Sequence, residues 1–173
     1  HYSLSDGAAA LGLPLVRFQH RQLRSLKSAL ERASAKKQRA LIATDGLFPV
    51  TAHLAPLDAY LDLAEKYDSL IWIDDAHGVG ILGENGRGSK EHFGLDSPRI
   101  YMGATLSKAF GGYGGLISGD QSFISRVKNG AVVMGSTPPM NAAIAASMKG
   151  LEVVSKEPLL RQKLWENAYL LKA

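Results

Sequence analysis

Cysteine is absent from the 173 residues of the chain. This absence excludes a disulfide framework and a thiolate metal site, and it fits a reducing compartment such as the cytoplasm without requiring one. Long apolar runs are missing too, since none approaches the ~18 residues of a membrane-spanning helix. The first residues also lack the basic-then-apolar order of a secretory signal. The sequence therefore indicates neither secretion nor a membrane partner.

A strong charge of one sign is also missing. The net charge is +4, and the 46% hydrophobic and 21% charged residues match an ordinary globular chain. Lys and Arg are scattered apart from a short cluster at residues 36–39, which fits the solvated end of a helix. A nucleic-acid partner is therefore not expected. The length suits one domain with a sizeable core.

Helical and strand patterns alternate along the chain. This alternation predicts an α/β fold with a mainly parallel sheet flanked by helices. Ligands in such folds bind beyond the carboxyl ends of strands, and the polar clusters at 74–77 and 105–108 each follow a predicted strand. A loop is expected from about 78 to 94. The expected helices span residues 22–35, 56–67, 120–128, 139–154 and 159–173, and the expected strands span 41–43, 70–73, 100–102 and 115–118.

Three motifs compete for the function, and each fails on a specific requirement. Residues 78–83 spell G-x-G-x-x-G, but four residues separate them from the strand and a loop follows where a dinucleotide site needs a helix. Residues 103–108 resemble a phosphate loop, yet no Gly precedes the Lys and no Ser or Thr follows it. No metal is expected, because the available ligands form only a loose pattern. They are His53, Asp74, Asp75 and His77.

A different chemistry fits the order of polar residues. Asp74 ends a strand, His77 follows three residues later, and Lys108 lies some thirty residues on in a turn rich in Ser, Thr and Gly. Pyridoxal phosphate (PLP) requires a Lys amine, a carboxylate beside its pyridine nitrogen, and hydroxyl and N–H donors such as Thr105 and Ser107 for its phosphate. By type and spacing alone, the Lys also fits a surface position and the Asp a capping role.

Several motifs in order resemble the α-oxoamine synthase family of fold-type-I PLP enzymes, within aminotransferase class I/II. This resemblance implies the large domain of a PLP-dependent transferase. It also implies a homodimer with a shared active site. The residues that carry it are Thr44–Phe48, Ala55–Leu57, Asp74–Gly78, Gly83–Gly88, Thr105–Gly111 and Gly135–Pro139.

The resemblance also implies roles for single residues. Lys108 forms the Schiff base to PLP and removes the Cα proton of the bound amino acid, Asp74 pairs with the pyridine nitrogen, and His77 pairs with the ring oxygen. Thr105 binds the phosphate. Ser136 and Thr137 reach the phosphate of the neighbouring subunit's cofactor, although Pro138 also makes them candidate caps of a helix.

The implied activity joins an amino acid to an acyl-CoA or acyl-carrier thioester. In most branches decarboxylation follows and an α-aminoketone leaves. General likeness favours the 8-amino-7-oxononanoate synthase subfamily of biotin synthesis, with the aminoketobutyrate ligases next. Two alternatives stay open: an ordinary aminotransferase, which shares the Asp and the Lys, and a non-catalytic PLP-fold domain used for regulation.

The sequence departs from the family pattern in two ways. Residues 49–52 are Pro-Val-Thr-Ala where the family usually has Ser-Met-Asp-Gly, so the hydroxyl near the cofactor is missing. In addition, residues 1–173 are expected to be only the central part of the large domain. We expect two parts of the family's enzymes to be missing from these residues. One is the N-terminal segment with the side chain that stacks on the PLP ring, and the other is the C-terminal domain with the Arg that binds the carboxylate. Alone, the chain is expected to be a poor catalyst.

Overall fold

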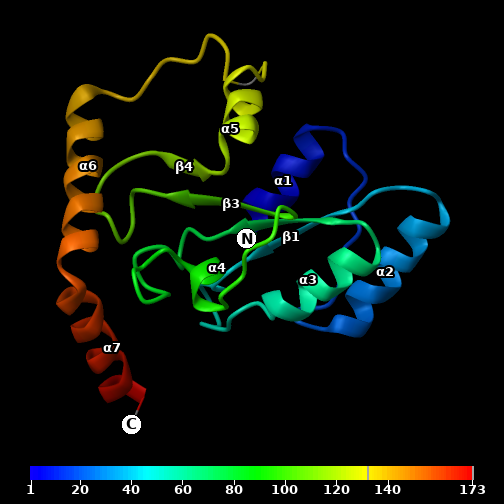
Figure 1. The fold of residues 1–173 in the computed structure, drawn as a ribbon, viewed down its shortest axis with the longest axis horizontal. Coiled ribbons are helices and arrows are strands. Elements are labelled where there is room, and N and C mark those ends of the chain that lie inside the picture. Colours follow the sequence, from blue (N-terminus) through cyan, green and yellow to red (C-terminus); the bar gives the residue numbers. More distant parts are fainter. Residues whose placement is uncertain (132, 173) are drawn as a thin grey trace.

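A four-stranded sheet flanked by helices forms the centre of the chain (Figure 1). The computed structural model describes residues 1–131 and 133–172. The predicted α/β class is confirmed. The helices are α1 (Tyr2–Ala10), α2 (Leu23–Ala35), α3 (Leu57–Lys66), α4 (Ser89–His92), α5 (Gln121–Lys128), α6 (Asn141–Lys156) and α7 (Pro158–Lys172). The strands are β1 (Leu41–Asp45), β2 (Leu70–Asp74), β3 (Ile100–Thr105) and β4 (Gly115–Ser118).

The strands lie in the order β1-β2-β3-β4, and the first three run parallel. Their register places Asp45 beside Asp74 and Asp74 beside Gly103, so that three strand ends meet at one edge. Strand β4 is antiparallel to β3. The connecting residues 106–114 are too few for the dozen or more that a parallel crossover requires, so the chain turns straight back.

The hydrophobic core lies between the sheet and helices α2 and α3. Leu26 and Leu30 project from α2, Tyr60 projects from α3, and Ile71 and Ile73 of β2 are fully buried. Burying a large aliphatic side chain contributes about 1.5–3 kcal/mol, so this cluster is what holds β1 and β2 in place. The amphipathic patterns of the two helices predicted this packing.

The structure differs from the prediction at several helices. Helix α1 was not expected, because its residues are small and none is buried. The predicted loop at 78–94 contains the single-turn helix α4. Helix α6 begins at Asn141 with Met140 in the N-cap position, so Ser136 and Thr137 do not cap it. None of the helices in the described part of the chain is both long and apolar enough to cross a membrane.

Helix α6 packs tightly on the loop between β3 and β4. The Ser147 hydroxyl accepts a hydrogen bond from the N–H of Tyr113 at 3.0 Å and donates one to its carbonyl at 3.1 Å. Gly150 lies so close to the loop that a Cβ there would overlap the carbonyl oxygen of Phe110. The helix therefore fixes the loop that carries Lys108.

Candidate active site

Lys108 and His77 form the centre of the candidate site. Lys108 lies in the loop after β3, His77 lies in the turn after β2, and the Lys108 Nζ is 2.8 Å from the His77 Nε2. Burial and the nearby Lys108 cation lower the pKa of His77, so the neutral imidazole is favoured. An ammonium can only donate, so Nε2 accepts this hydrogen bond and the ring proton resides on Nδ1.

Asp74 is the last residue of β2 and is half-buried. Its Oδ1 accepts a hydrogen bond from the backbone N–H of Ala76 at 3.1 Å, which shapes the turn that brings His77 round to Lys108. The carboxylate thus lies at the edge of the sheet where β1, β2 and β3 end. This is the position at which α/β folds bind ligands.

A polar cavity of about 260 Å³ gathers most of the predicted site residues. Asp74, His77, Thr105, Ser107 and Lys108 all line it. Ser136 and Thr137 do not line it, and Ser136 instead donates a hydrogen bond to the carbonyl of Val133. Their assignment to a neighbouring subunit's cofactor stays a prediction. The remaining lining residues are His1, Ser3, Asp45 and Ala76.

Thr105 and Ser107 place two hydroxyl groups side by side in this cavity. Their oxygens lie 2.8 Å apart, and Thr105 Oγ1 also contacts the carbonyl of Gly114 at 3.2 Å. The N–H of Ser107 donates to Thr105 Oγ1 at 3.2 Å. Neighbouring hydroxyls on a turn supply the donors that a phosphate group requires.

Sequence reasoning missed three residues of the polar cavity. Asp45 had a readable signal, because it ends β1 just as Asp74 ends β2, and parallel strands end at a common edge. His1 and Ser3 had none, since only the position of α1 brings them to the cavity. His1 brings an imidazole-bearing residue to the cavity, and its backbone nitrogen lies 2.6 Å from Asp45 Oδ2. The expected lack of the N-terminal segment with the ring-stacking side chain stays a prediction.

The departure at residues 49–52 lies away from this site. Pro49 and Thr51 are exposed, and neither lines the polar cavity or the apolar cavity beside it. The turn is closed instead by a hydrogen bond of 2.9 Å from the N–H of Phe48 to the carbonyl of His53. Thr51 therefore does not replace the missing hydroxyl within the polar cavity.

Asp75 lines neither cavity but connects the turn after β2 to helix α4. The side chain is fully buried, and its Oδ2 accepts a hydrogen bond of 2.7 Å from the backbone N–H of Ser89 at the start of α4. A Cβ on Gly88, whose φ is +92°, would overlap this same oxygen. Burial raises the pKa of Asp75, and the adjacent Asp74 adds to the effect, while hydrogen bonds from Ser89 oppose it.

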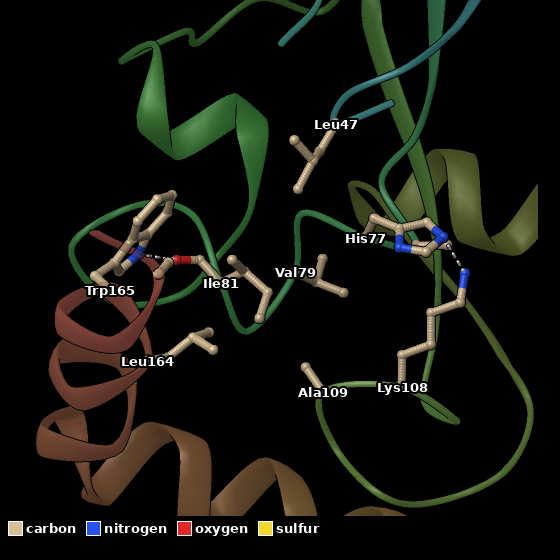
Figure 2. Close-up of a pocket in the computed structure, with 10 residues that line it drawn as sticks. Leu47, His77, Val79, Ile81, Lys108, Ala109, Leu164 and Trp165 are labelled. Atoms are coloured by element: carbon tan, nitrogen blue, oxygen red, sulfur yellow. Dashed lines mark hydrogen bonds between the residues drawn. The ribbon is translucent and has the colours of Figure 1, made fainter. Parts of the chain in front are cut away.

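Figure 2 shows the residues that line a second, apolar cavity of about 320 Å³. The two share Ala76, His77 and Lys108, so both open on the Lys108 amine. Its other lining residues are Leu47, Val79, Ile81, Ala109, Leu164, Trp165 and Ala168.

Fold and site together define an α/β enzyme-like domain with one lysine at the carboxyl edge of its sheet. The family model of aminotransferase class I and II matches residues 1–173, so the chain belongs to that family. This confirms the class inferred from the motifs.

Individual relatives narrow the comparison. 8-Amino-7-oxononanoate synthase 1 of Bacillus subtilis is 38% identical over 174 residues, which cover 100% of this chain and 44% of the relative. A serine palmitoyltransferase of S. paucimobilis with bound PLP–myriocin superposes with a TM-score of 0.89 at 26% identity, over 97% of this chain and 44% of that one. The 8-amino-7-oxononanoate synthase of Francisella tularensis shares the fold, with a TM-score of 0.81 at 24% identity over 96% and 48% of the two chains. The chain spans less than half the length of each of these proteins.

Proposed function

We propose that this chain forms the PLP-binding part of an α-oxoamine synthase that joins an amino acid to an acyl thioester. The observation that carries the proposal is the placement of Lys108, His77 and Asp74 around one cavity at the carboxyl edge of the sheet. The relatives named 8-amino-7-oxononanoate synthase support that activity over an aminotransferase or a regulatory domain. The expected amino acid is therefore alanine and the expected acyl group is pimeloyl.

The donor set of the polar cavity fits PLP. When bound, PLP supplies an aldehyde that condenses with amines and a ring that withdraws electrons from a neighbouring carbon. Lys108 offers an exposed amine to hold it, and Asp74 offers a carboxylate for the pyridine nitrogen. The paired hydroxyls of Thr105 and Ser107 offer donors for the phosphate.

Each residue then has a defined task. Lys108 would hold the cofactor through its amine, and the same amine would take the Cα proton of the bound amino acid. Neutral His77 holds the Lys108 amine at 2.8 Å and is placed to bond the ring oxygen. Asp74 would pair with the ring nitrogen and so help the cofactor to stabilise negative charge at Cα.

Assembly belongs to the same proposal. Residues 1–173 would be the central part of a large PLP-binding domain within a homodimer. Ser136 and Thr137 would serve the partner's cofactor, since they lie away from the polar cavity of their own chain. A cytoplasmic location accompanies the proposal, because the cysteine-free sequence and a biosynthetic activity both suit that compartment.

An acyl-transfer assay tests the proposal on the full-length protein as its gene encodes it. With PLP, L-alanine and pimeloyl-CoA, we expect release of free CoA, detected as a thiol, and an aminoketone product. Lys108→Ala should abolish release, whereas Lys128→Ala, which changes an exposed lysine of α5, should retain it. Amino-group exchange with a keto acid in the absence of any thioester would identify an aminotransferase instead and contradict the proposal.

A further inference from the structure

Two histidines from distant parts of the chain meet at the surface, away from both cavities. His20 lies before α2 and His53 lies in the turn after β1, and both side chains are exposed. The His20 Nε2 is 3.5 Å from the His53 Nδ1, and the ring centroids lie 5.8 Å apart. A hydrogen bond from an N–H group is usually about 2.7–3.2 Å long, so this contact is a weak one. The two nitrogens are therefore neighbours that bind each other poorly.

Phe48 and the turn that it closes hold the two rings in this arrangement. The Phe48 ring contacts the His20 ring edge-to-face, with centroids 4.4 Å apart and planes at 79°. The carbonyl of His53 accepts a hydrogen bond of 2.9 Å from the N–H of Phe48. Phe48 thus packs on the ring of one histidine and fixes the backbone of the other, which keeps the pair together.

The separation of the two nitrogens suits a shared metal ion. Neutral imidazole is a good ligand for zinc, copper and nickel. Two zinc–nitrogen bonds of about 2.0–2.1 Å span the 3.5 Å between Nε2 and Nδ1 at an angle of roughly 113–122°, which is close to tetrahedral. Among the residues that the structure describes, no group of three or more His, Cys, Asp or Glu could hold a metal ion. Water would therefore complete the coordination, and the exposure of both rings admits it.

We propose that His20 and His53 form a two-histidine site for a divalent transition metal ion such as zinc. The ligating atoms are His20 Nε2 and His53 Nδ1, and a bound ion joins the segment before α2 to the turn after β1. No sequence pattern predicted the site, because 33 positions separate the two ligands. His53 directly follows residues 49–52, where the sequence departs from the family pattern. Neither histidine lines a cavity at Lys108, so the site does not depend on the proposed reaction.

Zinc titration of the full-length protein tests this assignment. Bound metal would be removed with EDTA, zinc chloride would be added, and the stoichiometry and Kd would be measured by calorimetry. We expect His20→Ala and His53→Ala each to weaken one zinc equivalent at least tenfold, because each change removes one of the two ligands. The double variant should show almost no further loss, since either change already destroys the chelate. His92→Ala is the matched control, because His92 is also exposed and also lies edge-to-face on a Phe ring, and it should keep the wild-type binding.

Zinc binding that is unchanged in His20→Ala and His53→Ala would overturn the inference. A loss in only one of the two variants would overturn it as well, since a single ligand would then account for the binding. A loss of the same size in His92→Ala would trace the binding to scattered exposed imidazoles and contradict a paired site. Circular dichroism would check the folding of each variant. His53→Gln, which keeps a polar side chain of similar size in the turn, should lose the same zinc equivalent as His53→Ala.

Discussion

The charges of four neighbouring residues, Asp74, Asp75, His77 and Lys108, shape the candidate site. Partial burial and, after it, the Lys108 cation lower the pKa of His77, so its neutral imidazole is favoured and accepts the hydrogen bond from Lys108. Asp74, at the end of β2, lines the polar cavity. The neighbouring Asp75 is buried and lies outside the cavity, where it joins the turn to α4.

Asp75 makes stability depend on pH in a direction opposite to that of most carboxylates. Its pKa is raised above the ordinary value of 3.8, so the folded protein holds this proton to higher pH than the unfolded chain. The free energy of unfolding therefore falls as the pH rises from about 3.8, the ordinary pKa of Asp, through the raised pKa of Asp75. Asp75→Asn removes this loss, so the difference in thermal midpoint between variant and wild-type apoprotein should shift in favour of the variant between pH 4 and pH 7.

Asp62→Asn supplies the matched control for that measurement. Asp62 is exposed on α3, so this variant makes the same Asp-to-Asn change without removing a buried carboxyl. Its difference in thermal midpoint is the reference for the Asp75→Asn difference. An Asp75→Asn difference that varies with pH no more than this reference would show that the buried carboxyl carries no linked proton.

The position of Lys108 depends on contacts between its loop and a helix that lies far away in the sequence. The loop 106–114 turns β3 back into antiparallel β4, and α6 clamps it through Ser147 and the close approach of Gly150 to Phe110. The short connection indicates the strand direction, but the clamp has no sequence signal, because it joins residues more than thirty positions apart. The clamp ties the position of Lys108 to the packing of a helix that contributes no group to either cavity.

Gly150→Ala tests this coupling. The added methyl overlaps the Phe110 carbonyl, so α6 must move away from the loop at a cost of about 1–3 kcal/mol. We expect a lower thermal midpoint and roughly fivefold or greater loss of PLP affinity, measured by absorbance titration. Gly7→Ala in α1 meets no atom within 4 Å and should be neutral or stabilising by up to about 1 kcal/mol. Equal PLP affinity in both variants would contradict the clamp.

Over the complete chain, periodic patterns predicted the packed elements well. Helices α2 and α3 and strands β1 to β4 were predicted within a few residues. All of them except β4 place an apolar residue in the core. Helix α1, which buries no residue, offered no such pattern. The motifs likewise predicted Asp74, His77 and Lys108 as neighbours, whereas His1 and Ser3 reach the cavity only through the tertiary position of α1.

The apolar cavity likewise arises from tertiary structure and has no sequence pattern. Its walls come from four separate parts of the chain, with Leu47 after β1, Val79 after β2, Ala109 after β3 and Leu164 on α7. Leu47 and Ala109 lie within family motifs, but apolar residues at these four positions fit an ordinary core equally well. Only the arrangement of the elements shows that they surround a space next to Lys108.

The most direct test of the account is to find where PLP attaches. The full-length protein would be incubated with PLP, reduced with borohydride, digested and mapped by mass spectrometry, with Lys108→Ala treated in parallel. Among the residues that the structure describes, Lys108 is the one lysine that lines the polar or the apolar cavity, so we expect a single pyridoxyl adduct on it and none in the variant. A folded protein that carries the adduct on several lysines, or that remains unlabelled, would contradict the assignment of this site.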